Sequence, residues 1–260
     1  MGERLTTDTG TLSDGTHIFF STADDHPTAR VIALASPDID VTPVAGDLPT
    51  FELVPQNPDG VLLQSIHLVN DSTLILVYLR DACASVVFAD ARTGLPIGAT
   101  TPSGTRGHVH TVDTLDIPVP PAELNHATEH TPTASAIPKH ASISAISSRS
   151  DSPSFFFTVD TFVTSPYVLE GRLDLRSGAP EITLNRLGHE SAPVEDLVCD
   201  QVFYESHDGV NVPLFICHRA DLDPSKPHKT LLYAYGGSGI CMTPTHEPLF
   251  EAFMRDLNGV

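Results

Sequence analysis

Short runs of β-branched and aromatic residues, each closed by a cluster of Gly, Pro, Asp or Ser, recur along the first two thirds of the chain. Runs of this length between turn-forming residues are typical of strands, because a helix needs a longer periodic segment. The pattern therefore predicts that this part of the chain is all β. The runs cover residues 17–20, 30–34, 73–79, 85–89, 154–159 and 167–173.

Two of these runs end in the same way, which indicates a repeated unit. Residues 90–94 read Asp-Ala-Arg-Thr-Gly and residues 174–178 read Asp-Leu-Arg-Ser-Gly, each an Asp-led turn closed by glycine. Their separation exceeds the roughly 40–50 residues of a propeller blade. The stretch of about 103–148, rich in Pro, Thr, Ser, Ala and His, is predicted to be a long surface loop or disordered insertion. Without it the period is close to one blade, and an earlier unit ending near residues 36–38 brings the expected number of blades to about three.

Charge and composition exclude several classes of function. With 33 acidic against 14 basic residues, the formal charge is −19, so nucleic acid would be repelled. No segment approaches the roughly 18 consecutive apolar residues of a membrane span, and the start does not resemble a signal peptide. The four cysteines have no CxxC spacing and apolar neighbours, so we expect them to be reduced core residues of a cytoplasmic protein.

The pattern changes after about residue 195. A strand around Val202, an Asp208-Gly209 turn and a second strand over 212–217 predict a hairpin, and residues 230–235 predict a further strand. A Gly-rich turn follows. Apolar residues then recur on one face of a helix that Gly259 is expected to end, and strand, turn and helix together indicate the opening of an α/β domain. The residues of this helix face are Leu249, Phe250, Phe253, Met254 and Leu257.

Several of these segments resemble the prolyl oligopeptidase family. Residues 201–209 and 212–216 are similar to the start of the family's hydrolase domain, and 232–237, Leu-Tyr-Ala-Tyr-Gly-Gly, to its next strand and turn. Residues 53–55, 77–81 and 90–94 resemble late propeller blades of the same family. The resemblance implies a partial β-propeller over 1–190, followed over 191–260 by the first strands and first helix of an α/β-hydrolase domain.

The family cleaves short peptides after proline with Ser, Asp and His residues, all of which come later than the part of the family that this chain resembles. By resemblance, Tyr235 matches a tyrosine whose hydroxyl donates to the oxyanion of the tetrahedral intermediate, a role for which a neutral phenol is suited. Ser238 stands where the family has a phenylalanine that lines the proline pocket, which leaves proline selectivity open. Ordinary strand packing is the alternative role for Tyr233 and Tyr235.

Two other motifs are weaker candidates. Ser238 lies in Gly-Gly-Ser-Gly-Ile, which lacks the last glycine of the G-x-S-x-G elbow and has no paired base, so it is not expected to be a nucleophile. His126 and His130 fit the H-x-x-E-H order of zinc peptidases, but the prolines on both sides leave little room for the helix that such a site needs. No metal and no cofactor are expected.

Two functions follow from the sequence. The first is a fragment of a serine endopeptidase or oligopeptidase that acts on short proline-containing peptides but is itself catalytically incomplete. The alternative is a non-catalytic propeller module that binds peptides or regulates a partner. Because a partial propeller leaves sheet edges open, self-association is also expected.

Overall fold

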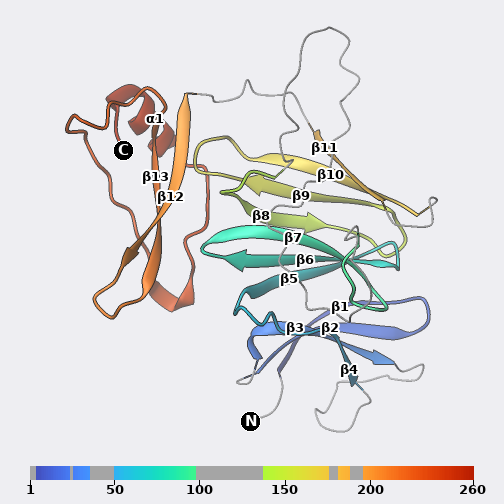
Figure 1. Cartoon of the computed structure of the whole chain (residues 1–260). Coiled ribbons are helices and arrows are strands. Elements are labelled where there is room, and N and C mark those ends of the chain that lie inside the picture. The colour runs from blue at the N-terminus through green and yellow to red at the C-terminus, as the bar shows by residue number, and fades with distance from the viewer. Residues whose placement is uncertain (1–3, 24–25, 36–49, 98–136, 176–180, 188–195) are drawn as a thin grey trace, which may run out of the picture.

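The computed structural model describes residues 4–23, 26–35, 50–97, 137–175, 181–187 and 196–260, which contain thirteen strands and one α-helix (Figure 1). Eleven of the strands form three antiparallel sheets in which neighbours along the chain are neighbours in the sheet. The first sheet holds β1 (Arg4–Thr11), β2 (Thr16–Ala23), β3 (His26–Ala35) and β4 (Thr50–Val54). The second holds β5 (Leu62–Val69), β6 (Thr73–Arg80) and β7 (Cys83–Asp90). The third holds β8 (Ser142–Ser147), β9 (Ser154–Asp160), β10 (Tyr167–Asp174) and β11 (Glu181–Leu187).

The second sheet is the middle layer of three, as Figure 1 shows. Its central strand β6 is buried on both faces, and successive side chains of a strand point to opposite sides. Leu74 and Leu76 accordingly join the core shared with the first sheet, while Ile75 and Val77 join the core shared with the third. Three stacked meander sheets form part of a β-propeller, so the predicted three blades are confirmed.

The core between the second and third sheets is built around phenylalanines. The ring of Phe155 lies 5.5 Å from that of Phe88 and 6.2 Å from that of Phe157, measured between centroids, and all three are almost completely buried. Gly171 of β10 lies directly opposite Phe155 of β9 in the register. A Cβ at Gly171 would come within 2.0 Å of the Phe155 ring, so only glycine leaves room for that ring.

The Asp-led turn at the end of β7 forms as predicted. One carboxylate oxygen of Asp90 accepts hydrogen bonds from the backbone N–H groups of Arg92 and Thr93, at 3.0 and 2.8 Å. Gly94 adopts a φ of +69°, which favours glycine, and donates its N–H to the Asp90 carbonyl. In the second predicted turn Asp174 ends β10, but residues 176–178 lie outside the described residues.

Two boundaries in the propeller differ from the prediction. The predicted insertion over 103–148 contains β8, which pairs with β9, and it also contains the buried Ala141 and Ile143. The Ser and Ala residues of this strand carry little hydrophobic signal, and its buried side chains pack in the core shared with the second sheet. Residues 98–136 of the predicted insertion lie outside the described residues. The first unit does not end near residues 36–38 either, since β4 follows and pairs with β3.

After the propeller, β12 (Leu197–Glu205) and β13 (Asn211–Arg219) form the predicted hairpin, and α1 (Pro248–Leu257) forms the predicted helix. Residues 230–235 do not form a strand. The backbone N–H of Leu231 donates to the carbonyl of Val260. No neighbouring strand among the described residues forms a ladder of backbone hydrogen bonds with this segment, and an apolar run without such a partner does not become a strand. Helix α1 ends at Leu257, and its C-cap Asn258 takes the left-handed conformation that was expected of Gly259.

The cysteines do not lie in the core as expected. Cys83, Cys199 and Cys217 are half-buried and Cys241 is exposed, and all four are free thiols.

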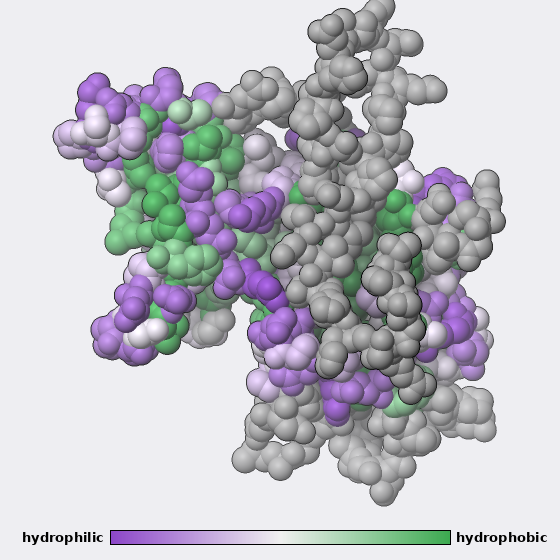
Figure 2. Space-filling model, in the orientation of Figure 1, coloured by the Kyte–Doolittle hydropathy of each residue, from purple (hydrophilic) through white to green (hydrophobic). Residues whose placement is uncertain are grey.

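Exposed apolar side chains gather over the C-terminal part of the chain, where Figure 2 shows the largest green area of the visible face. They include Phe203, Tyr204, Leu231, Leu232, Tyr233, Tyr235 and Leu249.

Candidate functional site: the junction between propeller and hairpin

The hairpin takes its register from the Asp208-Gly209 turn. Gly209 has a φ of +83°, and the N–H of Ser206 donates to the carbonyl of Val210 at 2.8 Å. Beyond the turn, the two strands pair without a shift from Glu205 opposite Asn211 to Leu197 opposite Arg219. Because the register is regular, alternate residues of both strands share one face.

One face of the hairpin packs against the third sheet and its flanking loops. The ring of Phe215 lies 5.0 Å from that of Phe162 and 5.7 Å from that of His140. The Nδ1 of His140 donates to the carbonyl of Cys199 at 3.1 Å, and the side-chain amide of Gln201 donates to the carbonyl of Asp81 at 2.6 Å. The hairpin is thus held on the propeller by an aromatic cluster flanked by hydrogen bonds.

The segment before α1 is tied to the same part of the propeller. The hydroxyl of Ser142 donates to the carbonyl of Pro244 at 2.6 Å, and the backbone N–H of His246 donates to Asp160 at 2.8 Å. Asp160 is the last residue of β9. Both contacts therefore link strands of the third sheet to the loop that positions α1.

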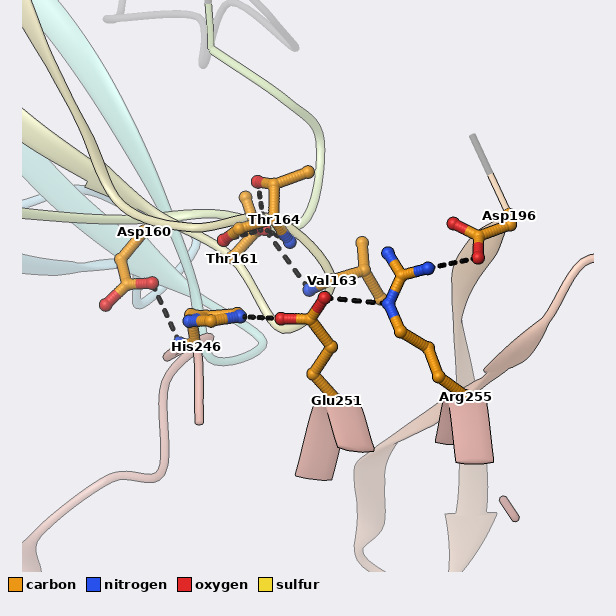
Figure 3. A network of polar contacts seen from close by, with 8 residues as sticks. All are labelled: Asp160, Thr161, Val163, Thr164, Asp196, His246, Glu251 and Arg255. Atoms are coloured by element: carbon orange, nitrogen blue, oxygen red, sulfur yellow. Dashed lines mark hydrogen bonds and ion pairs between the residues drawn. The ribbon is translucent and has the colours of Figure 1, made fainter. Parts of the chain in front are cut away.

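From His246 the polar contacts continue through α1 to the start of β12 (Figure 3). The Nε2 of His246 lies 2.7 Å from one carboxylate oxygen of Glu251, and the Nε of Arg255 donates to the other at 2.7 Å. Arg255 also forms an ion pair with Asp196, which directly precedes β12. We call Asp160, His246, Glu251, Arg255 and Asp196 the junction network.

The central carboxylate of the junction network is stabilised in its charged form. The hydrogen bond from His246, and after it that from Arg255, lowers the pKa of Glu251 below its ordinary value of 4.5. These interactions outweigh partial burial, which alone would raise the pKa. Glu251 is therefore a carboxylate at neutral pH and can accept from both partners.

Tyr235 lies on the side of the C-terminal part that is open to solvent. Its side chain is 52% exposed, and within the described part of the chain its hydroxyl has no hydrogen-bond partner. The side chain folds back over Gly237, because a Cβ built on Gly237 would lie 2.9 Å from the Tyr235 hydroxyl oxygen. A donor placed in this way can be aimed at a ligand rather than at the protein.

Tyr233 has a different environment. Its ring lies 5.7 Å from that of Phe250, so it packs against α1. The structure therefore separates the two tyrosines that the sequence left as equal candidates for packing: Tyr233 anchors the segment to the helix, and Tyr235 does not share that contact.

Ser238 lies in the short 3-10 turn at Gly237–Gly239 that follows Tyr235. It is exposed and has a φ of +57°, which is uncommon for a residue with a side chain. Among the described residues no histidine or carboxylate bonds its hydroxyl. The geometry gives Ser238 no base and hence no support as a nucleophile.

Metal binding has no candidate in the described ranges, where no group of three or more His, Cys, Asp or Glu side chains could hold an ion. The motif with His126 and His130 lies outside the described residues. No helix among those described is both long and apolar enough to cross a membrane.

The sequence indicates only one contact of the junction network. Glu251 and Arg255 stand four residues apart on a helix, a spacing that signals an ion pair. Nothing in the sequence indicates that Asp160 or Asp196 would meet this pair, because such contacts depend on how the propeller and the C-terminal part are placed.

No protein-family model matches this chain. A prolyl endopeptidase of Elizabethkingia miricola is 27% identical over 105 residues, which are 39% of this chain and 14% of that protein.

Among solved structures, prolyl oligopeptidase B from Galerina marginata has a TM-score of 0.62 and 17% identity, covering 93% of this chain and 27% of its own. Oligopeptidase B from Trypanosoma brucei has a TM-score of 0.60 and 19% identity, covering 97% of this chain and 30% of its own. The chain thus spans less than a third of each of these proteins. The resemblance of this chain to the prolyl oligopeptidase family is confirmed, in sequence over part of its length and in fold over nearly all of it.

Proposed function

We propose that residues 1–260 form the junction between propeller and hydrolase domain of a serine peptidase of the prolyl oligopeptidase family. In this proposal residues 1–190 belong to the propeller, residues 191–260 begin the hydrolase domain, and the protein is cytoplasmic. The solved relatives include one bound to a peptide substrate and one bound covalently to antipain. Short peptides, with proline as the preferred residue at the cleavage site, are the substrates that we propose.

The exposed hydroxyl of Tyr235 is the observation that carries this function. In acyl transfer, a donor aimed at the developing oxyanion lowers the barrier because the charge is greater in the transition state than in the substrate. Tyr235 lies in the run Tyr-Ala-Tyr-Gly-Gly, which is similar to the family's Tyr-Gly-Tyr-Gly-Gly, and its hydroxyl is not bonded by the rest of the described structure. Tyr233, only two residues away, is used for packing on Phe250.

Residues 1–260 contain no Gly-x-Ser-x-Gly run, so we expect this polypeptide by itself neither to hydrolyse a proline-containing anilide nor to react with a fluorophosphonate. Labelling that is lost on Ser238→Ala would contradict this assignment. The non-catalytic binding module is favoured instead if the chain binds short peptides tightly but remains inactive when it replaces the equivalent segment of a full-length relative.

The catalytic role is tested in a chimera in which this chain replaces the equivalent segment of the Elizabethkingia miricola enzyme. Tyr235→Phe should lower kcat by roughly 10²–10³-fold, the usual effect of losing one oxyanion donor, with a smaller change in KM. Tyr233→Phe is the matched control and should leave kcat almost unchanged. A narrower chimera, exchanging residues 197–260 only, serves if the larger one does not fold. Equal effects of the two substitutions would show that Tyr235 is not the oxyanion donor.

A further inference from the structure

Two of the four cysteines face each other across the hairpin. Cys199 of β12 is the register partner of Cys217 of β13, and their sulfur atoms are 3.2 Å apart. Both are free thiols and both are half-buried, so reagents of small size can reach them. No short sequence motif contains both cysteines. Their pairing follows from the turn centred on Asp208, because both cysteines are equally far from that residue along the chain.

The position in the ladder suits a covalent bond. Antiparallel pairs alternate between hydrogen-bonded and non-hydrogen-bonded, and the Cα atoms of the latter are closer, about 4.5 Å apart. Backbone bonds at Ser206 with Val210 and at Ala220 with Asp196 mark two hydrogen-bonded pairs. The cysteine pair is an odd number of steps from each, so it is a non-hydrogen-bonded pair.

Pro213 gives an independent check that the cysteines form a non-hydrogen-bonded pair. Proline has no N–H and fits within a paired strand only where none is needed. Pro213 is an even number of steps from Cys217 along β13, so the two have the same place in the alternation. The expected Cα separation of about 4.5 Å lies within the range of roughly 4.4–6.8 Å that disulfides span.

The two thiols also differ chemically from the nearby Cys83. The hydrogen bond between the two sulfur atoms lowers the pKa of Cys217 and raises the pKa of Cys199, because one thiolate is stabilised by the thiol that remains beside it. Burial, by contrast, raises the pKa of Cys83 to about 11. Of these three residues, Cys217 has the sulfur best suited to act as a nucleophile.

We propose that Cys199 and Cys217 form a redox-modifiable dithiol site, which the disulfide of a low-molecular-weight thiol such as oxidised glutathione converts into a cross-strand disulfide. The thiolate of Cys217 attacks one glutathione sulfur, forming a mixed disulfide and releasing one glutathione thiolate. Cys199 then loses its proton and attacks the Cys217 sulfur, which releases the second glutathione. Two protein thiols are oxidised, and one glutathione disulfide is reduced to two glutathione molecules.

The site lies where a covalent link affects the junction. Gln201 and Phe215, both on the same hairpin face as the cysteines, make the contacts with Asp81 and Phe162. A two-stranded ribbon is only marginally stable by itself, so a bond across its open end should hold this face in its packed conformation. Amide exchange in β12 and β13 should therefore slow on oxidation and recover on reduction.

The first experiment is equilibration of the purified chain with mixtures of reduced and oxidised glutathione, followed by acid quenching and mass spectrometry. Formation of the bridge removes two hydrogen atoms, about 2 Da, without a glutathione adduct. Trypsin leaves both cysteines on one peptide, but additional cleavage after glutamate separates residues 196–205 from 206–219. These two peptides should remain joined until a reductant is added.

Matched variants complete the test. Cys83→Ser with Cys241→Ser should still lose the two hydrogen atoms, whereas Cys199→Ser should stop at a glutathione adduct on Cys217. The proposal is overturned if both thiols stay open to alkylation at every glutathione ratio, if the adduct persists in the unaltered chain, or if the joined peptides contain Cys83 or Cys241. The peptide map of the unaltered chain decides the question even if a variant does not fold.

Discussion

The imidazole of His246 binds Glu251 through Nε2 at 2.7 Å, while its own backbone N–H binds Asp160 of the propeller at 2.8 Å. The side chain of His246 is only 8% exposed, so this contact is shielded from solvent. A single residue thereby joins the end of β9 to helix α1. The contact connects two parts of the chain that the sequence assigns to different domains.

Glu251→Gln should weaken the junction network. The carboxylate of Glu251 accepts hydrogen bonds from both His246 and Arg255. The amide of glutamine is uncharged and has only one oxygen, so it cannot accept both bonds as strongly. Because the side chains of Glu251 and Arg255 are 27% and 31% exposed and thus partly screened by water, we expect a loss of about 1 kcal/mol in the free energy of unfolding. Urea denaturation near neutral pH measures this loss in the free energy of unfolding. Glu247→Gln, which changes an exposed glutamate at the start of the same helix, should have almost no effect.

The same pair of proteins tests the pH dependence. The pKa of Glu251 is lowered in the folded state from an ordinary value of 4.5, so its contribution is fully present above that value. It is lost as the pH falls through the lower, folded-state pKa. The difference in stability between the unaltered chain and Glu251→Gln should therefore shrink below a pH of about 4. A difference that grows in acid would mean that the carboxylate is not stabilised by the junction network.

Gly171→Ala should destabilise the propeller core. The new methyl group would lie 2.0 Å from the ring of Phe155, which is buried between two sheets and cannot move aside without disturbing Phe88. Overpacking of this kind costs about 2–3 kcal/mol. Gly236→Ala is the control, since a Cβ there has nothing within 4 Å. Comparable denaturation midpoints for the two variants would show that the Phe155 ring has room to shift.

The sequence predicts the strands of the propeller better than their limits. Runs such as that of β6 contain enough β-branched and aliphatic residues to identify a strand buried on both faces. The sequence does not predict β8, because Ser and Ala carry little hydrophobic signal. The strand predicted over residues 230–235 is wrong, because an apolar run does not guarantee a partner strand. Tyr235 could be found from its local motif, whereas the junction network and the cysteine pair depend on contacts between distant segments.

Self-association should depend on the C-terminal part of the chain. Leu232 and Leu249 are 78% and 75% exposed, and apolar surface of this kind favours contact between molecules. Replacing both by serine should lower the sedimentation coefficient at a given concentration without reducing stability, because neither side chain is buried in the fold. Leu95→Ser, at a residue 62% exposed beside the Asp90 turn, is the control. If the control reduces association equally, the contact does not involve the C-terminal part.

Gly237→Ala should impair catalysis through Tyr235 without unfolding the protein. The added Cβ would come 2.9 Å from the Tyr235 hydroxyl oxygen and 3.1 Å from the ring carbon that bears it, so the phenol must move. A side-chain tip can move at little cost, and therefore the denaturation midpoint should not change. In the Elizabethkingia chimera, kcat should fall toward the value of Tyr235→Phe, by at most about 10²–10³-fold, while Gly236→Ala, whose Cβ meets open space, should retain activity. Because both changes act on one hydroxyl, Gly237→Ala should add little once Tyr235→Phe is present. Fully additive losses in that double variant would show that the glycine serves a purpose other than leaving room for the tyrosine.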